Sequence, residues 1–187
     1  MKKGKTIFAV IMAMALAFAV VGCGKKDDND KKDGNSGASA TAFEKMNTTT
    51  LDGEKADSKI FAKNKVTVVN IWSLTCPPCI AELPHLSKIN DKLKSKGVGV
   101  IGIVYETGKD DSNATLDKTK DLLKKVKATH PQLKLSEDML KSEEFSNIAY
   151  FPTTFFVDSK GKVLKQKAGA ADEKGWEDEI LEVLKDV

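Results

Sequence analysis

Two apolar, β-branched runs separated by a helical stretch constrain the fold of this chain more than any other feature. Val66 to Trp72 (VTVVNIW) and Gly97 to Tyr105 (GVGVIGIVY) have the composition of strands that are buried on both faces. Between them, from Cys76 to about Lys96, apolar residues recur at helical spacing, and glycine commonly ends a helix. Strand, helix and strand in this order predict a parallel βαβ unit with a right-handed crossover.

The other predicted elements continue this alternation and indicate an α/β protein. They are an edge hairpin within residues 43–55, a helix from Ser112 or Asn113 to about Ala128, an extended QLKL segment, a short helix over 136–146, a hairpin over 153–167 and a final amphipathic helix from Asp172.

The N-terminus has the organisation of a secretory signal. Three lysines precede an unbroken apolar run from Ile7 to Val21, which is shorter than the roughly 20 apolar residues of a membrane-spanning helix. Val20 to Cys23 resemble the lipobox of bacterial lipoproteins, in which cleavage falls before the cysteine and its sulfur carries a lipid. We therefore predict a signal peptide over 1–22 and lipidation of Cys23. An uncleaved membrane anchor and a cytosolic protein with an apolar N-terminus are the alternatives.

The remainder divides into a tether and one domain. Residues 23–41 lack large apolar side chains, so burial cannot offset the ordering entropy and we expect a flexible, lipid-anchored tether. Residues 42–187 have the length of one domain with a proper core. Removal of residues 1–22 takes away three lysines and no acidic residue. The 30 basic residues of the full chain thereby fall to 27, which equals the 27 Asp plus Glu. This balance gives no reason to expect a nucleic-acid partner.

Two cysteines that enclose two prolines stand where the first buried strand passes into the helix. Cys76 falls at the expected N-cap, and Pro77 and Pro78 are tolerated in the first turn because the N–H groups there have no helical partner. The prolines leave the Cys79 amide as the nearest donor to the Cys76 sulfur. This amide and the helix dipole favour the thiolate, so we predict an attacking thiol at Cys76 and a more buried resolving thiol at Cys79.

Three other uses of this cysteine pair have less support. A structural zinc site commonly needs a second CxxC or a histidine pair, but the two histidines, His85 and His130, are not spaced as a pair. We interpret His85 as a helix-surface residue and His130 as a loop residue, which leaves a Cys-His hydrolase without a base. A purely structural disulfide of this spacing would close little chain entropy. Redox exchange is therefore preferred, and no metal is expected.

Two motifs together resemble a known family. The pattern VVNIWSLTCPPCIAELP, followed later by YFPTTFFVD, resembles the thioredoxin superfamily and, within it, the membrane-tethered TlpA/ResA-like thiol-disulfide oxidoreductases. The likeness covers about residues 43–187. It implies a thioredoxin fold, a central mixed β-sheet flanked by helices, with an N-terminal β extension and a helical insertion over about 110–145. It also implies chemistry at the Cys76–Cys79 pair without a dissociable cofactor.

Further residues take their expected roles from this resemblance. Pro152 matches a cis-proline that lies against the active site, and the backbone of Phe151 would pair with an extended client. Asn70 stands where thioredoxin keeps a buried aspartate. Glu82 matches an acidic residue of ResA-like proteins that can exchange protons with the thiols, while an exposed glutamate favoured by the helix dipole is the alternative. Trp72 is expected in the core, either beside the site or for packing alone.

The resemblance implies a lipid-anchored, extracytoplasmic enzyme that reduces disulfides of exported proteins, such as apocytochrome c in cytochrome c maturation or an oxidised repair enzyme. Its electrons would come from a membrane thiol transporter. A disulfide-forming oxidase, a peroxiredoxin-like peroxidase and a non-catalytic binding lipoprotein are the alternatives, although no PxxxTxxC arrangement supports the peroxidase. Thr75 departs from the tryptophan that the family usually has, which affects the substrate-facing rim. The lysines of the insertion predict a solvated face.

Overall fold

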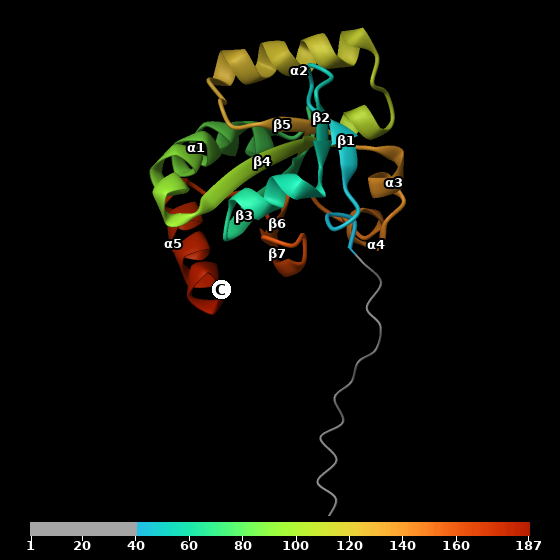
Figure 1. Ribbon diagram of the computed structural model, residues 1–187. Helices are drawn as coiled ribbons and strands as arrows, with labels where there is room; N and C mark the ends of the chain where they lie inside the picture. Colours follow the sequence, from blue (N-terminus) through green and yellow to red (C-terminus); the bar gives the residue numbers. More distant parts are fainter. Residues whose placement is uncertain (1–40) are drawn as a thin grey trace, which may run out of the picture. The chain divides into compact units, whose positions relative to one another are not determined.

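The computed structural model describes residues 41–187 (Figure 1), so the predicted signal peptide, Cys23 and nearly all of the predicted tether lie outside the described residues. The observed elements follow the predicted order along the chain. The strands and α-helices are β1 (Asn47–Thr49), β2 (Lys55–Asp57), β3 (Val66–Trp72), α1 (Pro77–Leu93), β4 (Val98–Val104), α2 (Asn113–Val126), β5 (Gln132–Lys134), α3 (Glu137–Leu140), α4 (Glu143–Ser146), β6 (Thr153–Asp158), β7 (Val163–Ala168) and α5 (Glu173–Val183).

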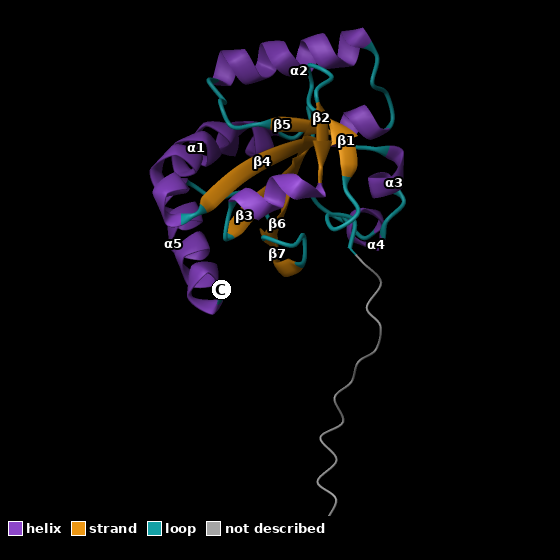
Figure 2. Cartoon of the chain, in the orientation of Figure 1, coloured by secondary structure: helices purple, strands orange, loops and turns teal. Residues whose placement is uncertain are grey.

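The main sheet is mixed and has the strand order β5-β4-β3-β6-β7. Strands β3, β4 and β5 are parallel, whereas β6 is antiparallel to β3 and β7 is antiparallel to β6. Parallel strands need crossover connections, which α1 and α2 supply, while the adjacent antiparallel strands β6 and β7 need only a turn. Figure 2 shows the strands in the centre with helices around them. The predicted βαβ unit and C-terminal hairpin are confirmed.

Apolar side chains cover both faces of this sheet. Alternate residues of β3 point to opposite faces, as the pleat requires. Val66 and Val68 pack with α1 and α5, which lie against each other, whereas Val69 and Ile71 pack with the N-terminal segment, α3 and α4. The second face carries a group of aromatic rings, and Phe43 is at its centre. Burial on both faces explains why β3 and β4 read as continuous apolar runs.

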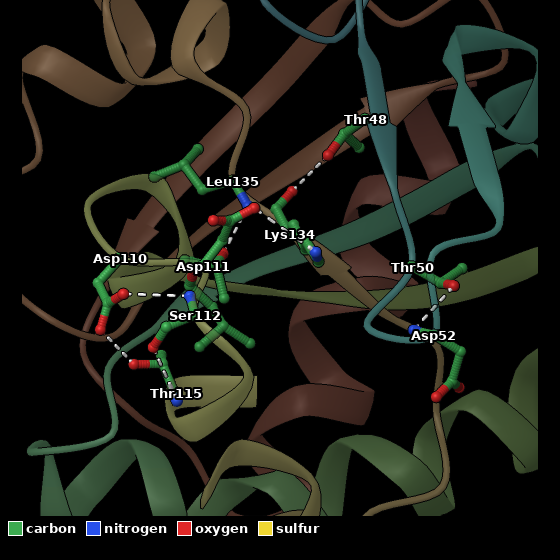
Figure 3. A network of polar contacts seen from close by, with 11 residues as sticks. Thr48, Thr50, Asp52, Asp110, Asp111, Ser112, Thr115, Lys134 and Leu135 are labelled. Carbon is green, nitrogen blue, oxygen red and sulfur yellow. Dashed lines mark hydrogen bonds and ion pairs between the residues drawn. The ribbon is translucent and has the colours of Figure 1, made fainter. Parts of the chain in front are cut away.

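The strands β1 and β2 form the predicted N-terminal hairpin, which is a separate two-stranded sheet. Its connection to the main sheet runs through β5. The Thr48 hydroxyl donates to the Lys134 carbonyl at 2.8 Å (Figure 3). Thr50 forms an isolated bridge with Leu133. The hairpin therefore borders the edge strand of the sheet.

One local feature departs from the expectations, whereas the end of α1 agrees with them. The segment predicted as one short helix forms α3 and α4, and the break falls where Ser142 serves as a new N-cap. Helix α1 ends at Leu93 and continues to Lys96 as a 3₁₀ turn, and Gly97 then ends it with φ of 82°, a backbone region that favours glycine. None of the helices within residues 41–187 is long and apolar enough to cross a membrane.

Candidate active site

The cysteine pair sits at the start of α1, where β3 has just ended. Cys76 is the N-cap, Pro77 and Pro78 occupy the first helical positions, and the Cys79 N–H donates to the Cys76 sulfur at 3.3 Å. The two sulfurs are joined in a disulfide. Cys76 is half-buried beside exposed prolines, whereas Cys79 is 0% exposed. One sulfur therefore faces the surface, and its partner is enclosed beneath it.

The peptide bond between Phe151 and Pro152 is cis and directly precedes β6. Pro152 is buried, and its carbonyl accepts a hydrogen bond from the Gly169 N–H at 2.8 Å. Phe151 belongs to the edge of an apolar cluster that also contains Cys76, Cys79 and Trp72. The fold thus brings the YFPTT motif to the cysteine pair, as the sequence predicts. Tyr150, just before it, is 73% exposed.

A carboxyl group is buried on the helix that carries the cysteines. Glu82 is 1% exposed, so the alternative of an exposed first-turn glutamate is wrong. It lies three residues after Cys79, which places both side chains on the same face of α1. Asn70 donates from Nδ2 to Glu82 Oε1 at 2.9 Å and to Thr154 Oγ1 at 2.9 Å. Asn70 therefore links the sheet to the Glu82 carboxyl.

Two more donors reach Glu82 from the C-terminal part of the chain. The Ala171 N–H and the Trp176 indole N–H both donate to Oε2 at 3.1 Å. These bonds and the one from Asn70 favour the ionised form, but desolvation outweighs them. Burial raises the pKa of Glu82 from 4.5 to about 7. At neutral pH this carboxyl can therefore both accept and release a proton.

A second carboxylate, which the sequence did not single out, holds the turn before Cys76. Glu106 follows β4, and its Oε1 accepts from the Ser73 hydroxyl at 2.6 Å and from the Leu74 N–H at 3.0 Å. Its Oε2 is buried and has no hydrogen-bond partner within residues 41–187. The available clue was its position, because polar residues directly after parallel strands gather at one edge of the sheet.

Trp72 is fully buried in the cluster that contains Cys79, and its indole is tied to a buried polar chain. Its Nε1 donates to Gln132 Oε1 at 2.9 Å, and Gln132 Nε2 lies 2.8 Å from His130 Nε2. His130 Nδ1 lies 2.8 Å from the hydroxyl of Ser87, which itself donates to the Leu83 carbonyl. The position of Trp72 beside the redox pair is thus set by side chains from β5 and α1.

This chain of bonds assigns one tautomer to His130. Because the single hydroxyl proton of Ser87 points to Leu83, His130 Nδ1 must carry the proton that Ser87 accepts. Nε2 is then the acceptor for Gln132. His130 is indeed a loop residue, but it is 3% exposed, and burial lowers its pKa to about 4. His85, interpreted as a helix-surface residue, is half-buried.

Because His130 is buried in its neutral form, we expect the free energy of unfolding to fall as the pH is lowered. Its pKa is about 6.5 unfolded and about 4 folded, so its contribution is complete above pH 6.5 and is lost as the pH falls to 4. The difference amounts to about 3 kcal/mol. Denaturant unfolding of the wild type and His130→Gln should show a stability difference that shrinks by this amount from pH 7 to pH 4. A constant difference would contradict the buried neutral histidine.

Within residues 41–187 no group of three or more His, Cys, Asp or Glu side chains is arranged to hold a metal ion. The absence of a dissociable cofactor remains a prediction from the resemblance.

The comparisons with known proteins agree with this geometry. The family model described as Redoxin matches residues 35–184. The chain belongs to the Redoxin family. This Redoxin chain is 27% identical to the thiol-disulfide oxidoreductase ResA of Bacillus cereus (strain ATCC 10987 / NRS 248), over 98% of this chain and 99% of that protein. It is 32% identical to the thiol:disulfide interchange protein DsbE of Pseudomonas fluorescens biotype C, over 74% of this chain and 71% of that protein.

A solved structure supports the same assignment. The crystal structure of StoA from Bacillus subtilis matches with a TM-score of 0.56 and 25% identity, and the match covers 71% of this chain and 93% of that one. The predicted thioredoxin fold and TlpA/ResA-like relationship are therefore confirmed, and this Redoxin chain is a thioredoxin-like thiol-disulfide oxidoreductase. The roles of individual residues and the lipid anchor stay predictions.

Proposed function

We propose that this protein reduces disulfides of exported proteins through Cys76 and Cys79. The observation that carries the proposal is the asymmetry of the pair, with a half-buried Cys76 sulfur at the helix N-terminus and a fully buried Cys79 beneath it. The Cys76 thiolate attacks a client disulfide, forms a mixed disulfide and releases one client thiolate. Cys79 then attacks the Cys76 sulfur, which closes the Cys76–Cys79 disulfide and releases the second client thiol. Two electrons pass from the dithiol to the client.

The reducing direction is supported by weak stabilisation of the thiolate. A strongly oxidising pair is one whose reduced, thiolate form is stabilised. Here Pro77 and Pro78 have no N–H groups to offer, so within the first turn Cys76 receives a hydrogen bond only from Cys79. The Glu82 carboxyl lies on the same face of α1 as Cys79. Whenever Glu82 is ionised, its negative charge opposes the formation of a thiolate at the cysteine pair. Both features limit the stabilisation that the Cys79 amide and the helix dipole give to the thiolate, and hence favour a low reduction potential.

Glu82 is proposed to exchange protons with Cys79. The resolving thiol must lose its proton before it attacks, and a buried carboxyl with a pKa of about 7 is a suitable acceptor at neutral pH. The side chains are three residues apart on α1, within one turn of each other. The backbone of Phe151, beside the cis-proline Pro152, is proposed to receive the client by strand-like pairing.

Extracytoplasmic location with a lipid on Cys23 is part of the proposal and is supported by the N-terminal sequence and by the resemblance to membrane-tethered oxidoreductases. The electron donor is proposed to be a membrane thiol protein, and apocytochrome c is one client class. A disulfide-forming oxidase is the second candidate, because the half-buried Cys76 at the helix N-terminus could equally accept electrons from a client dithiol.

A redox titration separates the two directions. With the Cys23→Ser chain in glutathione or dithiothreitol buffers, we expect a two-electron transition of the CPPC pair at or below about −230 mV. A transition between about −120 and −180 mV would assign the protein to the oxidants and isomerases instead. If the pair did not exchange reversibly, the proposed function itself would be wrong.

A further inference from the structure

A groove with a volume of about 460 Å³ opens beside the cysteine pair. One wall is the turn from Ser73 to Thr75, which leads directly into Cys76. Another is Phe151, the residue before the cis-proline. The start of α2 closes the far side. A client whose sulfur is bonded to Cys76 therefore has this groove immediately next to it.

The inner part of the groove is aromatic. Tyr105 and Phe151 are both half-buried, and their ring centroids are 4.8 Å apart. Thr75 is exposed at the rim and contributes a small side chain where the family usually has a tryptophan. The wall next to Cys76 is therefore not filled by a large side chain at position 75, and the aromatic walls suit an apolar client side chain.

The carboxylates at this groove already have donors from the protein. Asp110 accepts from the Ser112 N–H at 3.1 Å and from the Thr115 hydroxyl at 2.6 Å, and these bonds lower its pKa (Figure 3). Glu106 is held by the Ser73–Leu74 turn, and its second oxygen is buried out of reach of a client. Neighbouring Asp111 pairs with Lys134 at 3.7 Å (Figure 3).

The lysines at the groove, in turn, have no charged partner among the described residues. Lys109 and Lys118 line it and are exposed, and neither forms an ion pair with any residue of the part of the chain that the structure describes. Lys109 Nζ lies 4.9 Å from the centroid of the Tyr105 ring, which holds this charge over the aromatic wall. Each ammonium thus keeps free donors for a partner at the groove mouth.

We propose that this groove selects client segments that carry a carboxylate side chain near the cysteine attacked by Cys76. An apolar client side chain would occupy the aromatic part, while Lys109 and Lys118 bind the carboxylate. An extended segment rises about 3.3 Å per residue, so we place the acidic residue within a few residues of the cysteine, on either side of it. This selection deepens the proposed function and depends on it. Lys118, one of the insertion lysines predicted only as a solvated face, and Lys109, just before the insertion, are thereby given a recognition role.

The test compares reduction rates for matched peptide disulfides. Three peptides are identical except for Asp, Asn or Lys at the second position on each side of the attacked cysteine. Using the dithiothreitol-reduced Cys23→Ser chain, freed of reductant, we expect the second-order rate constant to be about fivefold to tenfold larger for the Asp than for the Lys peptide at low salt. The preference should fall towards unity in 1 M salt, where charges are screened within about 3 Å.

Charge reversal assigns the preference to the two lysines. In the Lys109→Glu/Lys118→Glu double variant the Asp peptide should become the slower one. Lys125→Glu is the matched control for the single variant Lys118→Glu. The two substitutions change the net charge equally, and Lys125 lies on the same helix about 10 Å from Lys118. The control should keep the wild-type preference.

The outcomes separate this inference from the proposed function. Reduction of all three peptides at equal rates, or a preference that survives the double reversal, would overturn the groove assignment and leave the oxidoreductase intact. If no peptide disulfide were reduced faster with the protein than in buffer without it, the proposed reducing function itself would be wrong.

Discussion

The Cys79→Ser variant is expected to accumulate a stable mixed disulfide with its client, whereas Cys76→Ser is expected to lose turnover to the uncatalysed background. Cys76 carries the accessible sulfur at the helix N-terminus and Cys79 is fully enclosed. Removal of Cys79 therefore leaves attack possible but removes the thiol that breaks the mixed disulfide. Removal of Cys76 leaves a single thiol that a client disulfide cannot reach.

Mass spectrometry of the protein after reaction with a peptide disulfide measures both results. Both variants are made in a Cys23→Ser background, because the chain has three cysteines and only the CPPC pair should remain as a source of thiols. We expect one peptide adduct on Cys79→Ser and none on Cys76→Ser. An adduct that forms equally well on Cys79 would show that the assignment of attacking and resolving thiols is wrong.

The Glu82→Gln substitution is expected to change the pH dependence of the free energy of unfolding. The sign of this change is opposite to that expected for His130→Gln. The pKa of Glu82 is raised from 4.5 unfolded to about 7 folded, so burial favours the protonated form. The stability associated with this raised pKa is complete below pH 4.5 and is lost as the pH rises through 7. Over this window the loss amounts to about 3 kcal/mol.

Denaturant unfolding of the wild type and Glu82→Gln between pH 4 and pH 8 checks this expectation. Glutamine has the size of glutamic acid and stays neutral, so the wild type should lose about 3 kcal/mol relative to the variant as the pH rises. The His130→Gln series is the internal control, since its difference must run the other way below pH 6.5. In the wild type the two slopes oppose each other between about pH 4.5 and 6.5. Parallel slopes in the two series would show that one buried group is wrongly assigned.

The sequence predicted the site residues that depend on local chain geometry. The N-cap position of Cys76 and the hydrogen bond from Cys79 follow from a strand, a CPPC motif and a helix in direct succession. Burial of Asn70 follows from its place within a strand covered on both faces. Glu82 could not be decided in this way. Its position on α1 is compatible with either exposure or burial, and α5 and the Ala171 loop supply the cover.

The sequence by itself determined the α/β order of elements, the helix boundaries at Cys76 and Gly97, and the class of chemistry. These properties depend on residues within one or two turns of each other. Tertiary structure alone decided the Glu106 contact with the Ser73 turn, the bond chain from Trp72 to His130, and the groove in which Lys109 and Lys118 have no ion-pair partner among residues 41–187. Each of these joins elements distant along the chain, and a buried polar group acquires its pKa and its partners only when those elements pack around it.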